Sequence, residues 1–476
     1  MPIQTKRIPF ASDLATRDGT LTKDTRLVNA VFERDGSDIY ITKRPGLVNQ
    51  AVNAGLSNIG GTGITAFEPA SQELYIGQGT KLYTWDYAAG TPTDTGQILS
   101  GNQISFCRTY LDKNLFFHDR ATFWNTVNGT SYTNPTRPAT GSWCYGAVWL
   151  NDYVYVGNAD NNLIYGSYAG DPTNWSSLCN ISFYMTTDKL IALAKHLNYV
   201  VAFGNKSLQF YYDAGTGNGS TSISLATSGS YTSEVGCYSA FSIASTDNLT
   251  VWVSLSDSKG LGVHVLEGTS PVKISTPSVD KILEKYGHPI LPTGFLYKFN
   301  GHECYILNVL SGSITLVYDF STKMWCQWTT FNGSELQYSG AFYAASVSQH
   351  KAYVQDFFSG KIYSPDIGTY QDNGQPIYTR GVTELQDHGS TKMKFIRRAE
   401  IVGDLSPATT IQLSYSTDDY NSFSSPRTIP EAVGNRPAVY QLGQSRRRAW
   451  QMLHTDNTPL RLEALEVDFD EGEMDV

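Results

Sequence analysis

A pair of short apolar strands, most pairs carrying aromatic residues and separated by a tight turn, recurs seven times between residues 74 and 363. The first copy is Leu74-Tyr75-Ile76-Gly77 followed by Leu82-Tyr83-Thr84-Trp85. One marker residue from each copy shows the spacing: Tyr75, Phe116, Tyr155, Val201, Trp252, Tyr305 and Tyr353. Successive markers lie 39 to 53 residues apart, a period that is typical of propeller blades.

Each repeated unit is too small a sheet to bury both of its faces by itself. Packing such sheets around an axis covers those faces and leaves only short strand edges. Another apolar strand stands before most copies, for example Ile64-Thr65-Ala66-Phe67, and would supply the innermost strand of each sheet. We therefore predict an all-β fold with a β-propeller of about seven irregular blades. Six blades, one large β-sandwich or several small ones are the alternatives.

The composition suits this interpretation, because aromatic residues make up 13% of the chain and charged residues only 17%. Tyr, Phe, Trp, Val and Thr fit pleated, half-buried sheet surfaces. A chain of 476 residues can also bury a large core without disulfides. The cysteines stand in or beside apolar runs and lack CxxC spacing, so we expect buried free thiols at Cys107, Cys144, Cys179, Cys237, Cys304 and Cys326.

Two segments depart from the repeat. In residues 278–286 the apolar side chains share one helical face and Gly287 follows as a stop, which predicts a short inserted helix. From about residue 376, alternating strands such as Ile411-Gln412-Leu413-Ser414-Tyr415-Ser416 predict a C-terminal β-sandwich. Residues 1–50 contain little apparent core. The expected parts are therefore an N-terminal arm or added strand (1–50), a propeller (51–375) and a sandwich-like domain (376–476).

No catalytic signature is present, so we predict a protein that is not an enzyme and has no cofactor. His302-Glu303 lacks the second histidine of an HExxH zinc site, and the polar stretch at residues 158–162 lacks the glycine and glutamate of a calcium loop. We therefore predict no metal site. A glycosidase would need two converging carboxylates. Closing their own turns is the simpler role for the candidate aspartates, which are Asp86, Asp119, Asp213, Asp319 and Asp366.

The net charge of −9 argues against broad electrostatic capture of nucleic acid, which needs a basic surface. An acidic wall has the opposite effect, since it repels a phosphate backbone and lets it slide past. The N-terminus lacks the apolar segment of a secretion signal, and no run reaches the roughly 18 apolar residues of a membrane helix. We expect a chain that folds in a cytoplasm and does not span a membrane.

Arg446, Arg447 and Arg448 form the only tight basic cluster, with Trp450 close by. Arginine and tryptophan are frequent anchors in protein interfaces. We predict that these four residues contact a partner, either an acidic protein surface or a phosphate backbone. The alternative is the solvated start of a strand.

In the order of these features the chain resembles the tail hub or nozzle proteins of short-tailed bacteriophages (podoviruses), also called packaged-DNA stabilisation proteins or tail accessory factors. The resemblance covers nearly the whole chain and has no catalytic residues to carry over. It depends on the order of individually weak motifs: Met1-Pro2-Ile3-Gln4, Arg44-Pro45-Gly46-Leu47, Gly170-Asp171-Pro172-Thr173-Asn174-Trp175, Ser270-Pro271-Val272-Lys273-Ile274 before the helix, and residues 446–470.

The resemblance implies a structural virion protein of the phage tail, assembled in the cytoplasm of the bacterial host. It implies a homo-oligomeric ring, commonly of six copies, which lies below a tail adaptor ring and docks spikes or fibres and a needle or plug. Such a ring retains the packaged genome and conducts double-stranded DNA through its lumen. The rival hypotheses are a carbohydrate-degrading propeller and a carbohydrate-binding receptor protein, which would be a trimer.

Overall fold

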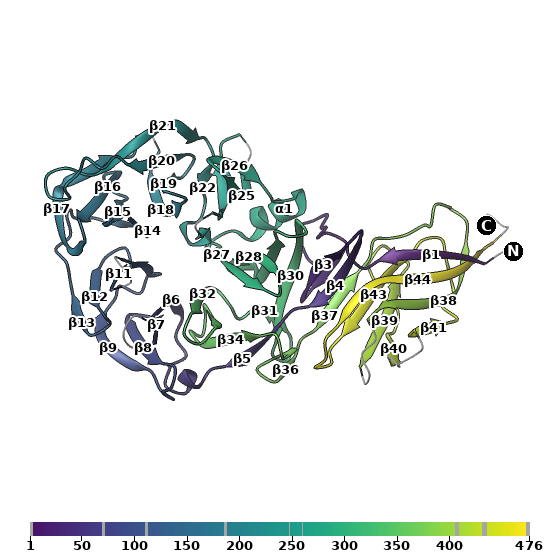
Figure 1. Cartoon of the computed structure of the whole chain (residues 1–476). Helices are drawn as coiled ribbons and strands as arrows, with labels where there is room; N and C mark the ends of the chain where they lie inside the picture. Colours follow the sequence, from purple (N-terminus) through teal and green to yellow (C-terminus); the bar gives the residue numbers. More distant parts are fainter. Residues whose placement is uncertain are drawn as a thin grey trace.

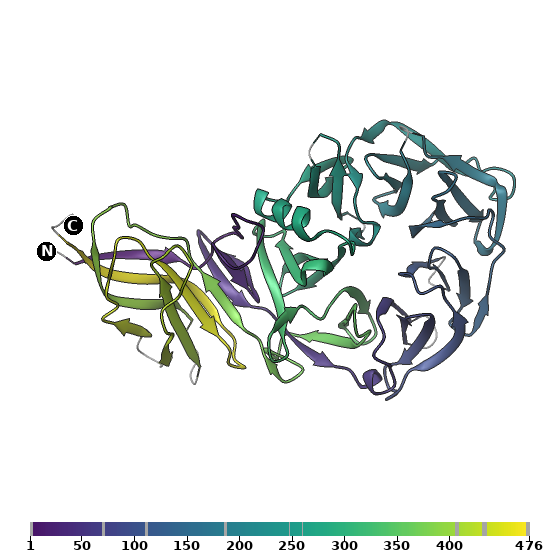
Figure 2. The same cartoon turned by 180° about the vertical axis from the view of Figure 1, so that it is seen from behind.

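The computed structural model describes residues 3–68, 72–109, 113–184, 188–246, 248–258, 260–404, 409–430 and 436–472, so Met1 and Pro2 of the first motif lie outside the described residues. A β-propeller and a β-sandwich lie next to each other and form an elongated molecule (Figure 1). Seen from behind, β1 (Gln4–Pro9) and β44 (Arg461–Glu471) lie side by side and antiparallel, so that β1 begins and β44 ends at the end of the sandwich farthest from the propeller (Figure 2).

Seven blades, counted over the described residues, surround the axis of the propeller (Figure 1). The first two are β6 (Gly61–Phe67), β7 (Glu73–Gln78), β8 (Lys81–Asp86) and β9 (Thr93–Ile98), then β10 (Ser105–Arg108), β11 (Asn114–His118), β12 (Phe123–Val127) and β13 (Ser131–Thr133). The third and fourth are β14 (Trp143–Leu150), β15 (Tyr153–Asn158), β16 (Leu163–Tyr168) and β17 (Asp171–Ser182), then β18 (Leu190–His196), β19 (Tyr199–Gly204), β20 (Leu208–Asp213) and β21 (Leu225–Ser233).

The fifth blade contains β22 (Gly236–Cys237), β23 (Ala244–Ser245), β24 (Thr250–Ser256), β25 (Gly260–Glu267) and β26 (Ser270–Lys273). The sixth contains β27 (Thr293–Phe299), β28 (His302–Val309), β29 (Ile314–Asp319), β30 (Met324–Phe331) and β31 (Glu335–Gln337). The seventh contains β32 (Phe342–Ser346), β33 (Lys351–Gln355), β34 (Ile362–Asp366) and β5 (Gly46–Asn49).

The predicted repeat coincides with the blades. Each pair of repeated strands forms two adjacent inner strands of one blade, and all seven marker residues are buried. The strand that precedes each pair lies nearest the axis, as β6 and β32 do. The propeller prediction is therefore confirmed, with seven blades rather than the alternative of six. The buried free thiols are also confirmed, since all six cysteines are buried and unpaired.

The seventh blade is completed by a strand from the other end of the chain. β5 pairs antiparallel with β34, with Gly46 opposite Asp366 and Asn49 opposite Tyr363. Its other side is covered by the short hairpin of β35 (Gln371–Asp372) and β36 (Gln375–Pro376). Because one blade contains strands from both ends of the repeat, opening the propeller would require breaking this pairing.

The one α-helix of the described residues, α1 (Pro277–Tyr286), lies between the fifth and sixth blades, as the sequence predicted. Thr276 is its N-cap, with Pro277 at the first helical position and Asp280 in the first turn. Val279, Ile282 and Leu283 are buried, which joins the helix to the cores of both blades.

The sandwich contains two sheets whose strands come from both ends of the chain. The first consists of β1, β3 (Ala30–Asp35), β4 (Asp38–Lys43), β44, β38 (Lys394–Gly403), β41 (Ala438–Tyr440) and β42 (Gln444–Ser445). The second consists of β2 (Arg26–Val28), β37 (Thr379–Val382), β43 (Ala449–His454), β39 (Thr410–Ser416) and β40 (Arg427–Pro430). β2 also pairs with β30 of the sixth blade, so hydrogen bonding continues from propeller to sandwich.

The N-terminal residues depart from the expectation that they contain little core. Ile8, Phe10, Leu27, Phe32 and Ile41 are buried in one cluster with the C-terminal strands. The strands are short. β1 and β4 pair with β44, more than 400 positions away, and β2 pairs with β37, more than 350 positions away, so the apolar residues show no pattern by themselves. We retain 51–375 and 376–476 as the proposed bounds of the two parts, with residues 1–50 shared between them.

Candidate functional site

The basic cluster is divided between surface and core. Arg446 and Arg447 are exposed, whereas Arg448 is 1% exposed and Trp450 is fully buried. The Arg448 guanidinium lies 3.9 Å from the centre of the Tyr415 ring, and its Nη1 donates to the Leu442 carbonyl at 3.0 Å. Burial lowers the pKa of Arg448 to about 10. Of the four residues predicted to contact a partner, only Arg446 and Arg447 are accessible in the single chain.

The turn aspartates close their own turns. In each of the five, Oδ1 accepts a hydrogen bond from the backbone N–H two residues later, at 2.8 to 3.3 Å. They belong to five different blades, namely the first, second, fourth, sixth and seventh. Their structural role is therefore confirmed, and none of the five is a lining residue of the cavity at the propeller axis, where a glycosidase would need two converging carboxylates.

The axis of the propeller contains a cavity of about 390 Å³ lined by residues of six blades. None of these lining residues is charged. Aromatic rings occupy much of the wall, with Tyr145 against Phe241 at 5.2 Å and Phe295 stacked on Tyr343 at 5.8 Å between ring centres. The lining of the axial cavity is thus uncharged, and it contains none of the carboxylates that hydrolysis of a sugar bond would need.

A buried ion pair lies where propeller and sandwich meet. Arg44 is fully buried and Asp372 is 2% exposed; their hydrogen bonds include Nη1 to Oδ1 at 3.0 Å. Arg44 also donates to the Asn29 side chain at 2.9 Å and to the Thr329 carbonyl at 2.7 Å. Burial opposes the charged form, but the Asp372 carboxylate raises the pKa of Arg44. This one side chain joins β5, the sixth blade and the β35–β36 hairpin.

The neighbouring residue, Lys43, belongs to a second buried polar group in the sandwich. Its Nζ lies 3.3 Å from Nδ1 of His454 and donates to the Asp456 carbonyl at 2.7 Å. The Thr409 hydroxyl lies 2.7 Å from the other ring nitrogen of His454. Burial lowers the pKa of Lys43 to about 7 and the pKa of His454 to about 4.

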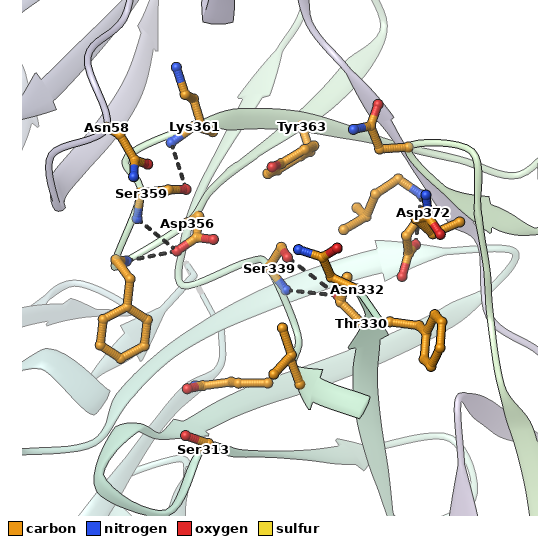
Figure 3. A pocket seen from close by; sticks show the side chains of 17 residues that line it. Asn58, Ser313, Thr330, Asn332, Ser339, Asp356, Ser359, Lys361, Tyr363 and Asp372 are labelled. Atoms are coloured by element: carbon orange, nitrogen blue, oxygen red, sulfur yellow. Dashed lines mark hydrogen bonds between the residues drawn. The ribbon is translucent and has the colours of Figure 1, made fainter. Parts of the chain in front are cut away.

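A groove of about 550 Å³ lies between the outer parts of the sixth and seventh blades (Figure 3). Its walls come from β5, the segment after it, β30, β31, the β33–β34 turn and the β35–β36 hairpin. Asp356 organises the turn on one side, because its Oδ1 accepts from the backbone N–H groups of Phe358 and Ser359 at 2.7 and 3.2 Å. Lys361 donates to the carbonyls of Asn53 and Leu56 at 2.9 and 2.6 Å.

Sequence analysis missed the groove and the axial cavity. Many of the groove residues are Asn, Gln and Ser, which cannot be distinguished from ordinary loop composition without the fold. Within the described residues, no group of three or more His, Cys, Asp or Glu side chains is placed to hold a metal ion. The same residues include no helix with the length and apolar character that crossing a membrane requires.

The family model described as bacteriophage P22 Gp10, β-propeller (Phage_stabilise), matches residues 23–366. None of the curated proteins matches the sequence. Virginiamycin B lyase from Staphylococcus aureus is a similar solved structure, with 10% identity, a TM-score of 0.43, and coverage of 68% of this chain and 98% of that chain.

Two further solved structures are similar. The N-terminal domain of Nup159 has 8% identity and a TM-score of 0.42, and the match covers 71% of this chain and 97% of that one. BamB from Moraxella catarrhalis has 12% identity and a TM-score of 0.40, and the match covers 76% of this chain and 97% of that chain. At these low scores the three structures support no functional argument.

Proposed function

Since the chain belongs to the bacteriophage P22 Gp10 β-propeller family, whose members are structural phage tail proteins that stabilise packaged DNA, we propose that it forms the nozzle or hub ring of a short tail. In this proposal about six copies form the ring below an adaptor ring. The ring retains the genome, conducts it during ejection, and docks spikes or fibres and a needle or plug. The protein acts mechanically and performs no chemical reaction.

The continuity of the chain from propeller to sandwich supports a rigid wall. β2 pairs with both β30 and β37, and the buried Arg44–Asp372 pair connects the same region. A hinge between domains usually lies in an exposed linker that few contacts cross. Here hydrogen-bonded sheet and a shared core cross the junction instead. A wall of such subunits would resist internal pressure without relative movement of its two parts.

The size of the axial cavity bears on where DNA would pass. The major groove of B-DNA alone is about 12 Å wide. A cube with the volume of the axial cavity, about 390 Å³, has an edge of roughly 7 Å, so the duplex is wider than this cavity. In this proposal the lumen therefore lies between subunits, and the propeller axes form part of the wall. The net charge of −9 favours a lumen that repels phosphates rather than binding them.

Cryo-electron microscopy of tails from native particles tests this proposal. We expect a closed ring of this chain around a central lumen lined by acidic and polar residues. A continuously basic lumen would contradict the sliding mechanism. A trimer at a fibre tip would contradict the whole proposal and favour a receptor-binding protein.

The assembly pathway has a separate test. We propose that the purified chain stays monomeric until the adaptor ring offers a template, which light scattering after size-exclusion chromatography would measure. A stable ring of the isolated chain would refute this step alone. Arg446 and Arg447 remain the proposed partner contacts, because both residues are exposed.

The five turn aspartates and the axial cavity do not favour the enzyme alternative. The candidate aspartates are distributed over five blades, and the axial cavity has no acidic lining residue. We expect no turnover in a hydrolysis screen on bacterial polysaccharides. Release of reducing ends by the purified chain would overturn this part of the proposal.

A further inference from the structure

The groove between the sixth and seventh blades has the composition of a ligand site. Its 17 lining residues comprise five amides, five hydroxyl residues, four apolar residues and three charged residues. Its volume of about 550 Å³ lies within the range of about 300–1,000 Å³ that is usual for small-molecule sites. Figure 3 shows Asn58, Asn332, Ser339 and Asp356 around the same opening.

The amides retain unused hydrogen-bonding capacity. Asn58 and Asn332 are exposed, and within the described residues neither carboxamide makes a hydrogen bond. The Gln337 carboxamide donates to Asn308 at 3.1 Å, but its buried Oε1 has no partner among the described residues. Each amide offers both donors and an acceptor, as does each hydroxyl. This lining matches a ligand whose own groups are hydroxyls, which also donate and accept.

The charged side chains of the groove already have partners. Lys361 donates to two backbone carbonyls, and Asp372 is paired with Arg44. One oxygen of Asp356 accepts from two backbone N–H groups. The groove therefore lacks the available cation that would select a phosphate or carboxylate ligand, so a neutral ligand fits it better.

Aromatic side chains supply the apolar part of the site. Phe358 is 54% exposed and lines the groove, and the partly buried Tyr363 also lines it. The face of an aromatic ring is electronegative and attracts the weakly positive C–H groups on the face of a sugar ring. Hydroxyl-matching amides beside the exposed Phe358 ring favour a pyranose ligand.

An extended peptide is the competing occupant, and it fits less well. Peptides that bind along a sheet use a row of free backbone groups on an open edge strand. Here the edge of β5 is covered by the β35–β36 hairpin, and the edge strand in the groove, β31, has only three residues. Most groove contacts would have to come from side chains in turns.

We propose that this groove binds a neutral oligosaccharide; its assignment to a bacterial surface glycan rests on the proposed function in a phage tail. The site adds a recognition function to the wall of the tail, and the argument for it does not depend on ring formation. Binding without hydrolysis is expected, because the groove contains Asp356 but no second carboxylate that is free of an ion pair.

The test uses the purified full-length chain and a panel of neutral hexasaccharides of glucose, galactose, mannose and N-acetylglucosamine. We expect at least one to bind in calorimetry with a Kd at or below about 1 mM. A hexamer of galacturonate should not bind. Absence of binding by every neutral sugar, or binding of the acidic hexamer alone, overturns the proposal, whatever is found for the ring.

Matched variants locate the site. Asn58→Ala combined with Asn332→Ala should weaken binding by about tenfold or more, since each lost hydrogen bond contributes about 1 kcal/mol. Phe358→Ala should weaken it similarly. Asn134→Ala, an exposed amide after β13 in the second blade, is the control and should leave the Kd unchanged. Equal affinity of the groove variants and the wild type, at unchanged Tm, would place the sugar elsewhere and refute the proposal.

Discussion

At the residue scale, Arg44 explains the position of the motif Arg44-Pro45-Gly46-Leu47, where the chain passes from the sandwich into β5 of the propeller. Its guanidinium is fully buried and donates to Asn29, Thr329 and Asp372, so it fixes three distant segments at one point. Tyr338 lies with its ring centre 5.0 Å from the Arg44 guanidinium. A lysine could not replace this arginine, because only a planar guanidinium presents a fork of donors in these directions.

Removing the carboxylate from this pair should be strongly destabilising. Asp372→Asn leaves a buried cation without its counter-ion, and breaking such a pair costs about 3–5 kcal/mol. Urea unfolding followed by tryptophan fluorescence would measure the loss. Lys81→Met, which breaks the exposed Lys81–Asp94 pair, is the control and should change stability little. Equal effects of the two substitutions would contradict the buried-pair argument.

Burial also makes the Lys43–His454 group sensitive to pH. The folded chain protonates His454 only below about pH 4, whereas an unfolded histidine binds its proton below about 6.5. Stability from this group is therefore complete above pH 6.5 and is lost as the pH falls toward 4. For Lys43, whose pKa falls from about 10.5 in the unfolded chain to about 7 in the folded chain, the same reasoning predicts that stability is lost as the pH falls from about 10.5 to about 7.

We expect His454→Gln to reduce the pH dependence of stability. Between pH 7 and pH 5 the depressed pKa of His454 accounts for roughly 2 kcal/mol of lost unfolding free energy. The variant lacks this titration, so its unfolding free energy should change less over the same interval. His350→Gln, at an exposed position, is the control. Its unfolding free energy should change with pH as steeply as that of the wild type. If the unfolding free energy of the His454 variant changed with pH as steeply as that of the wild type, other groups would control acid stability.

At the element scale, β5 is the strand on which closure of the propeller depends. A Cβ atom added at Gly46 would lie 2.2 Å from the Gln371 carbonyl oxygen and 2.9 Å from that of Thr369. Both are backbone atoms, so a side chain cannot be accommodated by rotating a neighbour. The glycine lets the hairpin that covers β5 approach its backbone closely, and the Gly46 N–H donates to Thr369 at 2.8 Å.

Gly46→Ala should therefore loosen the seventh blade specifically. We expect faster hydrogen exchange in β5 and β34 and a lower Tm, because the hairpin must move away to admit the methyl group. Gly90→Ala is the matched control, since a Cβ there meets nothing within 4 Å and its φ is not positive. Unchanged exchange in β5 would show that the close approach does not control closure.

At the scale of the whole molecule, the sandwich is a joint product of both chain ends. β1, β3 and β4 belong to its first sheet, and β2 lies between β30 and β37 in the second. The buried core of the C-terminal strands includes Phe10, Phe32 and Ile41 from the N-terminal segment. Stretching or twisting the sandwich would thus be transmitted directly to the sixth and seventh blades.

An excised fragment of residues 376–476 should not fold by itself. It lacks four strands and their buried side chains, and lost large apolar core residues cost about 2–5 kcal/mol each. Circular dichroism and urea titration should show no cooperative transition. Joining residues 1–44 to the fragment through a flexible linker should restore one. A cooperative transition in the bare fragment would refute the joint-core description.

Several elements were predictable because their signals are local. The seven strand pairs, α1 and the turn aspartates depend on spacing, capping and side chains two residues from their partners. Other features were not predictable, because they depend on contacts between residues far apart in the sequence. Arg448 and Trp450 resemble an exposed interface cluster in sequence, but the strand they enter faces the sandwich core. The groove residues come from segments about 300 positions apart and share no periodic pattern.

The sequence by itself determined that the chain forms blades, because a sheet's alternation and a recurring period of 39 to 53 residues are properties of neighbouring residues. Only the tertiary structure decided which strand closes the propeller, how the sandwich is shared and where the groove lies. Those features depend on pairing between residues hundreds of positions apart, and such pairing depends on the shapes of surfaces that exist only after the sheets have packed.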